Sequence, residues 1–174
     1  MNIELIPLEG IKINGLFITF GKKINEISEI GELKTFNNKV YYWKDELGIH
    51  CNENSEIEYL EFLGGYDGKL RPTIYGNDFF EMGADDAIKL LTEKNKESAI
   101  DENDSKPEYS YTFNEISVGL TREIAPWCID QDIKEAKANG SYDEKKESYD
   151  LDYFRSRHFD TIGIGVKNYY KDAF

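Results

Sequence analysis

Apolar and polar positions alternate most clearly between Val40 and Phe62. Tyr, Trp, Ile and Val are frequent there, and polar residues interrupt the stretch twice, which is typical of strands joined by tight turns. The pattern predicts three strands, at Val40–Trp43, Leu47–Cys51 and Ile57–Phe62.

A second stretch, Tyr109–Leu120, has a similar order of apolar and polar positions. Its hairpin can be aligned with the first so that Tyr111 matches Tyr42 and Ile116 matches Leu47. A third strand is then expected at Thr161–Val166, where alternating glycines leave one face nearly bare. Such a face allows a helix or another backbone segment to approach closely.

Apolar residues spaced three and four apart predict helices elsewhere in the chain. One such stripe runs from Lys22 to Gly31 and another from Ala84 to Lys94. A third helix is predicted at Asp130–Ala138. Ser141 and Glu144 have the spacing of a capping box, which predicts a fourth helix running to about Arg155.

These elements predict an α+β fold in which antiparallel meanders carry helices on one face. Residues 1–174 are expected to form a single domain with an internal repeat of one strand, one helix and three strands. The first copy covers about 11–63, a connector 64–76, and the second copy about 77–166, with an insertion at about 124–158. The copies are expected to begin with strands at Leu16–Phe20 and Asp78–Met82.

The net charge of the chain argues against some classes of binding partner. The 174 residues include 34 Asp and Glu against 21 Lys and Arg, a formal net charge of −13. Phosphate binding needs clustered Lys and Arg, so no nucleic-acid partner is expected. The sequence shows neither a signal peptide nor a long apolar run, and it has only two cysteines, which indicates a cytoplasmic protein without a membrane partner.

The residues that usually carry catalysis or bind metals are sparse. His50 adjoins Cys51, but neighbours on a strand point to opposite faces and cannot easily share a zinc ion. The acidic run that begins at Asp101 lacks the sixth-position glycine and the twelfth-position glutamate of a calcium loop. We therefore expect no catalytic residue, no cofactor and no metal.

The section from Ala99 to Asp160 combines carboxylates with aromatic side chains, as protein interfaces do. It holds fifteen Asp and Glu against eight Lys and Arg. We expect it to form an acidic partner-binding surface. The candidate partner-binding residues are Asp101, Asp104, Trp127, Asp130, Asp132, Tyr142, Tyr149, Asp150, Asp152 and Tyr153.

Two segments carry a resemblance to a known kind of protein: IKINGLFITFGKKINEISEIGE at 11–32 and YYWKDELGIHCNENSEIEYLEF at 41–62. They resemble single-domain immunity proteins of bacterial polymorphic and contact-dependent growth-inhibition toxin systems. The resemblance implies an antitoxin that binds a cognate toxin domain, often a basic nuclease, and blocks its active site. Two alternatives stay open: an enzyme with a small-molecule site between the two halves, and a structural or regulatory interaction module.

Overall fold

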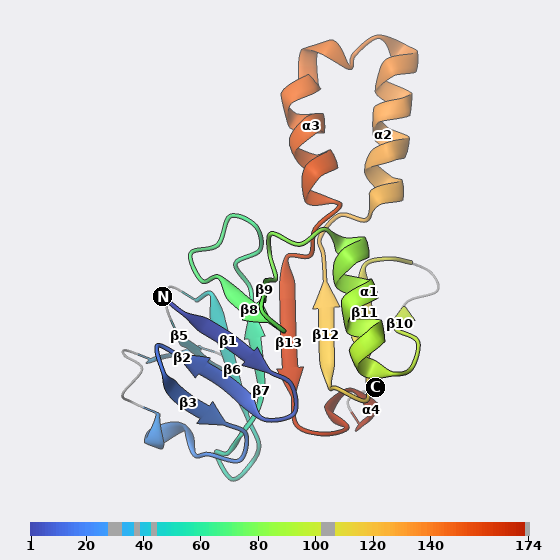
Figure 1. Ribbon diagram of the computed structural model, residues 1–174. Coiled ribbons are helices and arrows are strands. Elements are labelled where there is room, and N and C mark those ends of the chain that lie inside the picture. The colour runs from blue at the N-terminus through green and yellow to red at the C-terminus, as the bar shows by residue number, and fades with distance from the viewer. Residues whose placement is uncertain (28–32, 37–38, 43–44, 102–106, 173–174) are drawn as a thin grey trace.

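The computed structural model describes residues 1–27, 33–36, 39–42, 45–101 and 107–172. Their strands form two sheets, one of eight strands and one of five. Four α-helices accompany them within the described ranges. The predicted α+β class is confirmed (Figure 1).

The larger sheet is antiparallel throughout. In spatial order its strands are β10 (Ile100–Asp101), β11 (Ser110–Phe113), β12 (Val118–Thr121), β13 (Thr161–Gly165), β7 (Ile57–Phe62), β6 (Leu47–Cys51), β5 (Lys39–Tyr42) and β4 (Leu33–Phe36). The strands predicted around 40–62, 109–120 and 161–166 are therefore present, although Trp43 lies outside the described residues. The sequence patterns did not predict β4 and β10.

The smaller sheet packs across one face of the larger one and includes the start of the chain. Its order is β3 (Leu16–Thr19), β2 (Gly10–Ile13), β1 (Ile3–Ile6), β8 (Pro72–Ile74) and β9 (Asn77–Asp78). Strand β8 lies within the expected connector and pairs in parallel with β1, joining Ile3 to Pro72. The connector thus contributes an interior strand to this sheet.

The two meanders meet at the centre of the larger sheet. Strands β7 and β13 are each the third strand of a meander, and they pair so that Phe62 faces Ile162 and Leu60 faces Ile164. The hairpins are equivalent, but the register differs from the sequence alignment. Leu47 pairs with Tyr42 as Val118 pairs with Phe113, so the counterpart of Leu47 is Val118. The sequence alignment placed Ile116 there, two residues away.

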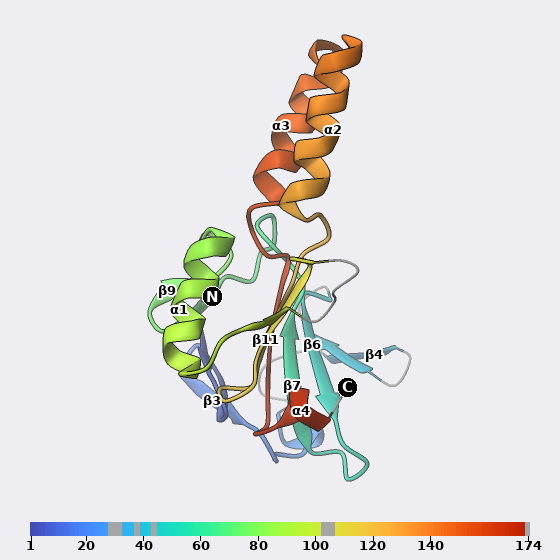
Figure 2. The same ribbon diagram turned by 90° about the vertical axis from the view of Figure 1, so that its right-hand side faces the viewer.

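The two faces of the larger sheet have different coverings (Figure 2). On the apolar face, α1 (Ala84–Asn95) and the smaller sheet enclose the core, into which the helix buries Ala87 and Leu91. On the other face lies the short helix α4 (Tyr169–Asp172), with the Tyr170 ring against Gly119. The helices were expected on one face only. The bare glycines make room for a second layer of tyrosine rings, as their spacing suggested.

Two of the predicted elements differ from the structure. The strand predicted at Asp78–Met82 is wrong, because β9 ends at Asp78 and a turn follows. This turn buries the adjacent Phe79 and Phe80 together, which the alternation of a strand would not allow. Of the helix predicted from Lys22 to Gly31, the described part up to residue 27 contains one 3₁₀ turn, η1 (Ile24–Glu26), and the rest lies outside the described residues.

The insertion forms a helical hairpin that projects from one end of the larger sheet (Figures 1 and 2). Helix α2 (Pro126–Asn139) begins with a proline and stops at Gly140, whose φ of 78° is the usual left-handed end of a helix. A 3₁₀ turn, η3 (Asp143–Lys145), leads into α3 (Lys146–Arg155). The predicted capping box is wrong: the Ser141 hydroxyl donates to the Asn139 side chain, and α3 starts five residues later.

Candidate partner-binding surface

The hairpin presents large apolar side chains to solvent. Helix α3 buries none of its residues. Leu151 is 47% exposed and Tyr153 45%, while Trp127 on α2 is 43% exposed. The main core cluster includes no residue of either helix. The hairpin is therefore attached to the body mainly at its base.

Arg157 ties the base of the hairpin together. Its Nη2 lies 2.9 and 3.0 Å from the two carboxylate oxygens of Asp130, and its Nη1 donates to the Ser156 hydroxyl. The guanidinium also lies over the Tyr153 ring, 3.5 Å from the ring centroid. Two candidate residues, Asp130 and Tyr153, are thus brought together by an arginine that the sequence did not single out. Its position directly after a predicted helix carrying carboxylates was the available signal.

At the tip of the hairpin, three candidate residues form one group. The Tyr142 and Tyr149 rings stack with centroids 5.8 Å apart, and the Tyr142 hydroxyl donates to Asp150 at 3.2 Å. Asp150 also forms an ion pair with Lys146, whose hydrogen bond lowers the pKa of this carboxyl. The negative charge of Asp150 is therefore partly neutralised within the hairpin.

The remaining candidates lie apart from these groups. Trp127 donates its ring N–H to the Pro107 carbonyl at 3.1 Å, and Asp101 accepts the Glu108 N–H at 2.7 Å. Asp132 is exposed and Asp152 half-buried, while Asp104 lies outside the described residues. Seven of the described candidates thus fall into separate groups: Tyr142, Tyr149 and Asp150 at the tip, Asp130 and Tyr153 at the base, and Asp101 and Trp127 beside the loop at 107–109.

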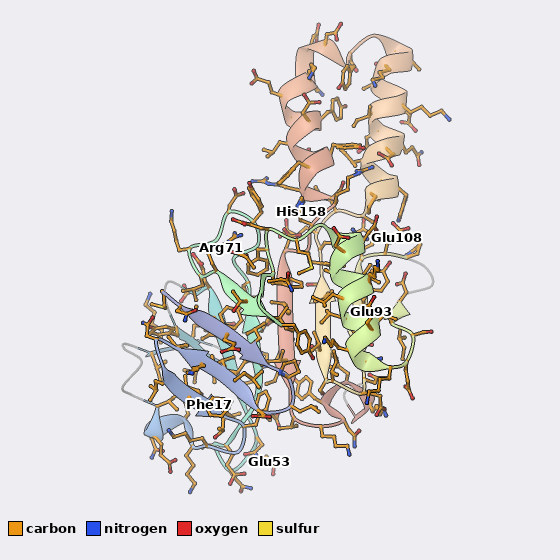
Figure 3. All side chains as sticks on the ribbon, viewed as in Figure 1. Phe17, Glu53, Arg71, Glu93, Glu108 and His158 are labelled. Carbon is orange, nitrogen blue, oxygen red and sulfur yellow. The ribbon has the colours of Figure 1, made fainter. Side chains whose placement is uncertain are left out.

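The sequence missed an aromatic group where the connector meets α3. Tyr66, Phe154 and His158 form this group, which we call the aromatic shoulder. Figure 3 shows His158 at the hairpin base, with Arg71 of the connector to one side and Glu108 to the other. Tyr66 was overlooked because it stands in a glycine-rich segment that was interpreted only as a connector. An aromatic residue among glycines was the signal that could have found it.

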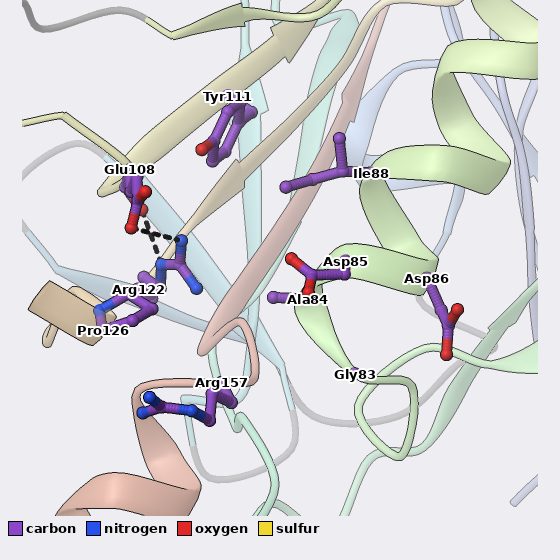
Figure 4. A pocket seen from close by; sticks show the side chains of 10 residues that line it. All are labelled: Gly83, Ala84, Asp85, Asp86, Ile88, Glu108, Tyr111, Arg122, Pro126 and Arg157. Atoms are coloured by element: carbon purple, nitrogen blue, oxygen red, sulfur yellow. Dashed lines mark hydrogen bonds and ion pairs between the residues drawn. The ribbon is translucent and has the colours of Figure 1, made fainter. Parts of the chain in front are cut away.

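A cavity of about 470 Å³ lies between the hairpin base and the start of α1. Arg122 lines its wall and is almost fully buried, donating to the carbonyl oxygens of Glu108 and Ser156. Burial lowers the pKa of Arg122 and raises that of the neighbouring Tyr111. Figure 4 shows Asp85 directed towards the cavity and Asp86 away from it.

The two arginines at this cavity form contacts that hold the surrounding segments together. The guanidinium of Arg122 joins the start of the hairpin to Ser156 at its end and to Glu108 before β11, and that of Arg157 contacts Asp130 and Tyr153. Within the residues that the structure describes, no group of three or more His, Cys, Asp or Glu side chains could hold a metal ion. Because both guanidinium groups at the cavity are engaged in contacts within the protein, we take the exposed surface of the hairpin and its base as the candidate site.

None of the helices in the described ranges is both long and apolar enough to cross a membrane. Comparisons of the chain with protein-family models, curated proteins and solved structures find no match.

Proposed function

We propose that the protein is a cytoplasmic immunity protein that binds a basic toxin domain, a nuclease, and covers its active site with the α2–α3 hairpin. The observation that carries this proposal is helix α3, which buries none of its residues although it bears Leu151, Tyr153 and Phe154. Large apolar side chains that stay exposed on a short helix are typical of a surface that a partner covers.

The stability of the hairpin also favours a binding role. Helices of 14 and 10 residues are marginal on their own and normally depend on packing of an apolar face. Here only Ile129 and Ala136 are buried among the residues of the two helices. A partner that covers the exposed side chains would supply the missing packing.

The net charge of the chain favours a basic protein as the partner. The chain carries a net charge of −13, which accelerates encounter with a basic protein and repels nucleic acid. Residues 126–157 hold eight acidic and six basic side chains, so most of this charge lies on the rest of the molecule. The whole body therefore provides the long-range attraction, and the hairpin provides the contact.

The shape of the hairpin suits the blocking of a cleft. Helix α2 has 14 residues, which corresponds to a length of about 21 Å at 1.5 Å per residue. An element of this length that stands clear of the sheets can enter an active-site cleft while the body stays outside. Carboxylates on the hairpin, such as Asp132 of α2, would take the place of substrate phosphates.

The experiment pairs the protein with the polypeptide encoded by the adjacent reading frame. Cells that produce this polypeptide should survive only when the immunity protein is co-produced, and the purified pair should form a one-to-one complex without nuclease activity. Purified neighbour that degrades nucleic acid equally well with and without an excess of the protein would contradict the proposal.

A further inference from the structure

We propose that the aromatic shoulder is the anchor point for the partner, where one apolar side chain of a basic protein is seated. This inference rests on the proposed function, because it requires a protein partner. It adds which part of the surface determines the dissociation rate of the complex.

The shoulder is assembled from segments far apart in the sequence. The Tyr66 ring meets the edge of Phe154 with centroids 4.7 Å apart, and His158 lies 4.3 Å from Phe154 and 5.7 Å from Tyr66. Leu151 precedes Phe154 by three residues, which places both on the same side of α3. The result is a continuous apolar surface with Tyr66 46%, Phe154 37% and Leu151 47% exposed.

Hydrogen bonds hold the His158 ring and the backbone at Tyr66 in place before any partner arrives. His158 Nδ1 lies 2.9 Å from the Phe154 carbonyl oxygen, and Arg71 donates to the Tyr66 carbonyl at 2.9 Å. Arg71 is itself fixed by a bidentate contact with Asp78. Anchoring aromatic residues that are already ordered lose little conformational entropy on binding, which is a property of interface hot spots.

The rim of the shoulder indicates the charge of the occupant. Arg155 forms an ion pair with Asp67 at 2.7 Å, and its pKa is raised by Asp67 and further by Asp152 and Asp160. Arg71 beside Tyr66 is likewise paired with two carboxylates, Asp78 and Glu81. Five carboxylates against two guanidinium groups leave the surroundings of the shoulder net negative. A basic protein complements this rim, whereas a second copy of the chain would bring like charges together.

The test measures binding kinetics against the immobilised polypeptide of the adjacent reading frame. We expect Phe154→Ser and Tyr66→Ser each to speed dissociation about tenfold, which corresponds to about 1.4 kcal/mol, and to change association little. Asp67→Lys should instead slow association. The matched control is Phe17→Ser, because Phe17 is 38% exposed but lies on the smaller sheet (Figure 3). Far-UV circular dichroism confirms that each variant is folded.

The outcomes separate this inference from the proposed function. If the wild-type protein binds and both shoulder variants dissociate at the wild-type rate, the shoulder is not the anchor point. The proposed function would then still stand. Failure of the wild-type protein to bind would overturn both. Sedimentation equilibrium that shows a dimer, lost in Phe154→Ser, would assign the shoulder to a second copy and overturn the inference as well.

Discussion

The ring of Tyr59 occupies the space that a Cβ atom on Gly163 would fill. Gly163 lies in β13 at the centre of the larger sheet, where it pairs with Glu61. The Tyr59 ring is stacked on Tyr169 with centroids 4.5 Å apart, and the Tyr170 hydroxyl donates to that of Tyr59 at 3.2 Å. The glycine is therefore required by an aromatic layer that joins the sheet to the end of the chain.

Substitution of Gly163 by alanine should destabilise the protein. The added methyl group would meet the Tyr59 ring in a packed layer, and overpacking of this kind costs about 1–3 kcal/mol. The free energy of unfolding, measured with urea, checks the expectation. Gly48→Ala is the matched control, because Gly48 pairs with Glu61 on the other side of β7 and its Cβ would make ordinary contacts only. Equal stability of the two variants would contradict the steric argument.

Because Tyr170 is buried, we expect the protein to lose folding stability at alkaline pH. Burial raises its pKa well above the ordinary value of about 10, with a smaller contribution from Tyr59. Above pH 10 the unfolded chain loses the phenolic proton while the folded protein keeps it, so unfolding becomes more favourable as pH rises. Urea midpoints between pH 8 and 11 should fall more steeply for the wild-type protein than for Tyr170→Phe. Parallel curves would show that Tyr170 is not responsible.

The contacts of Arg157 are expected to stabilise the α2–α3 hairpin against local unfolding. Arg157→Met removes the contacts with Asp130 and Tyr153, which together contribute roughly 1 kcal/mol at this partly exposed site. Amide hydrogen exchange in α2 and α3 should become faster, while exchange in β7 and β13 should be unchanged. Lys146→Met is the control, since its exposed pair with Asp150 at the tip should matter less. Faster exchange throughout the sheet would show that the hairpin and the body unfold together.

The sequence was sufficient where local patterns determine the structure. The strands of the two meanders, helix α1 and the helical insertion all followed from alternation, spacing and turn residues. The register of the repeat did not follow. A shift of two residues keeps each side chain on the same face of a strand, so Ile116 and Val118 fit the position equivalent to Leu47 equally well by pattern. The pairing of Val118 with Phe113 decides between them.

Long-range contacts explain what the sequence could not show. Strand β8 begins at Pro72 and has only three residues, and it exists because β1 provides a parallel neighbour 69 residues earlier in the chain. The carboxylates predicted to face a partner include Asp130. Its carboxylate instead accepts a hydrogen bond from Arg157, which lies 27 residues later in the chain. The aromatic shoulder likewise depends on contact between Tyr66 and Phe154.

The hairpin should be removable without loss of the fold. The first meander joins β6 and β7 by a tight turn around Asn52–Ser55, whereas the second joins β12 and β13 through the hairpin. The main core cluster contains no side chain from α2 or α3. The segments that enter and leave the hairpin stay joined without the helices, because Arg122, which follows β12, donates to the carbonyl of Ser156, which follows α3.

Replacement of residues 127–154 by a short Gly-Ser linker should therefore give a folded protein that no longer protects. The replaced residues contact the body through the Asp130 ion pair, the hydrogen bonds of Trp127 and Cys128, and the ring of Phe154 against Tyr66. These contacts are few and partly exposed, so we expect Tm to fall by only about 4 °C, equivalent to about 1 kcal/mol for a chain of this size. Calorimetry should show one cooperative transition, and complex formation with the adjacent-frame polypeptide should be abolished. A variant that unfolds much earlier would place the hairpin within the stabilising core. A variant that still binds and protects would move the partner surface to the sheets, and the exposed side chains of α3 would then have no part in inhibition.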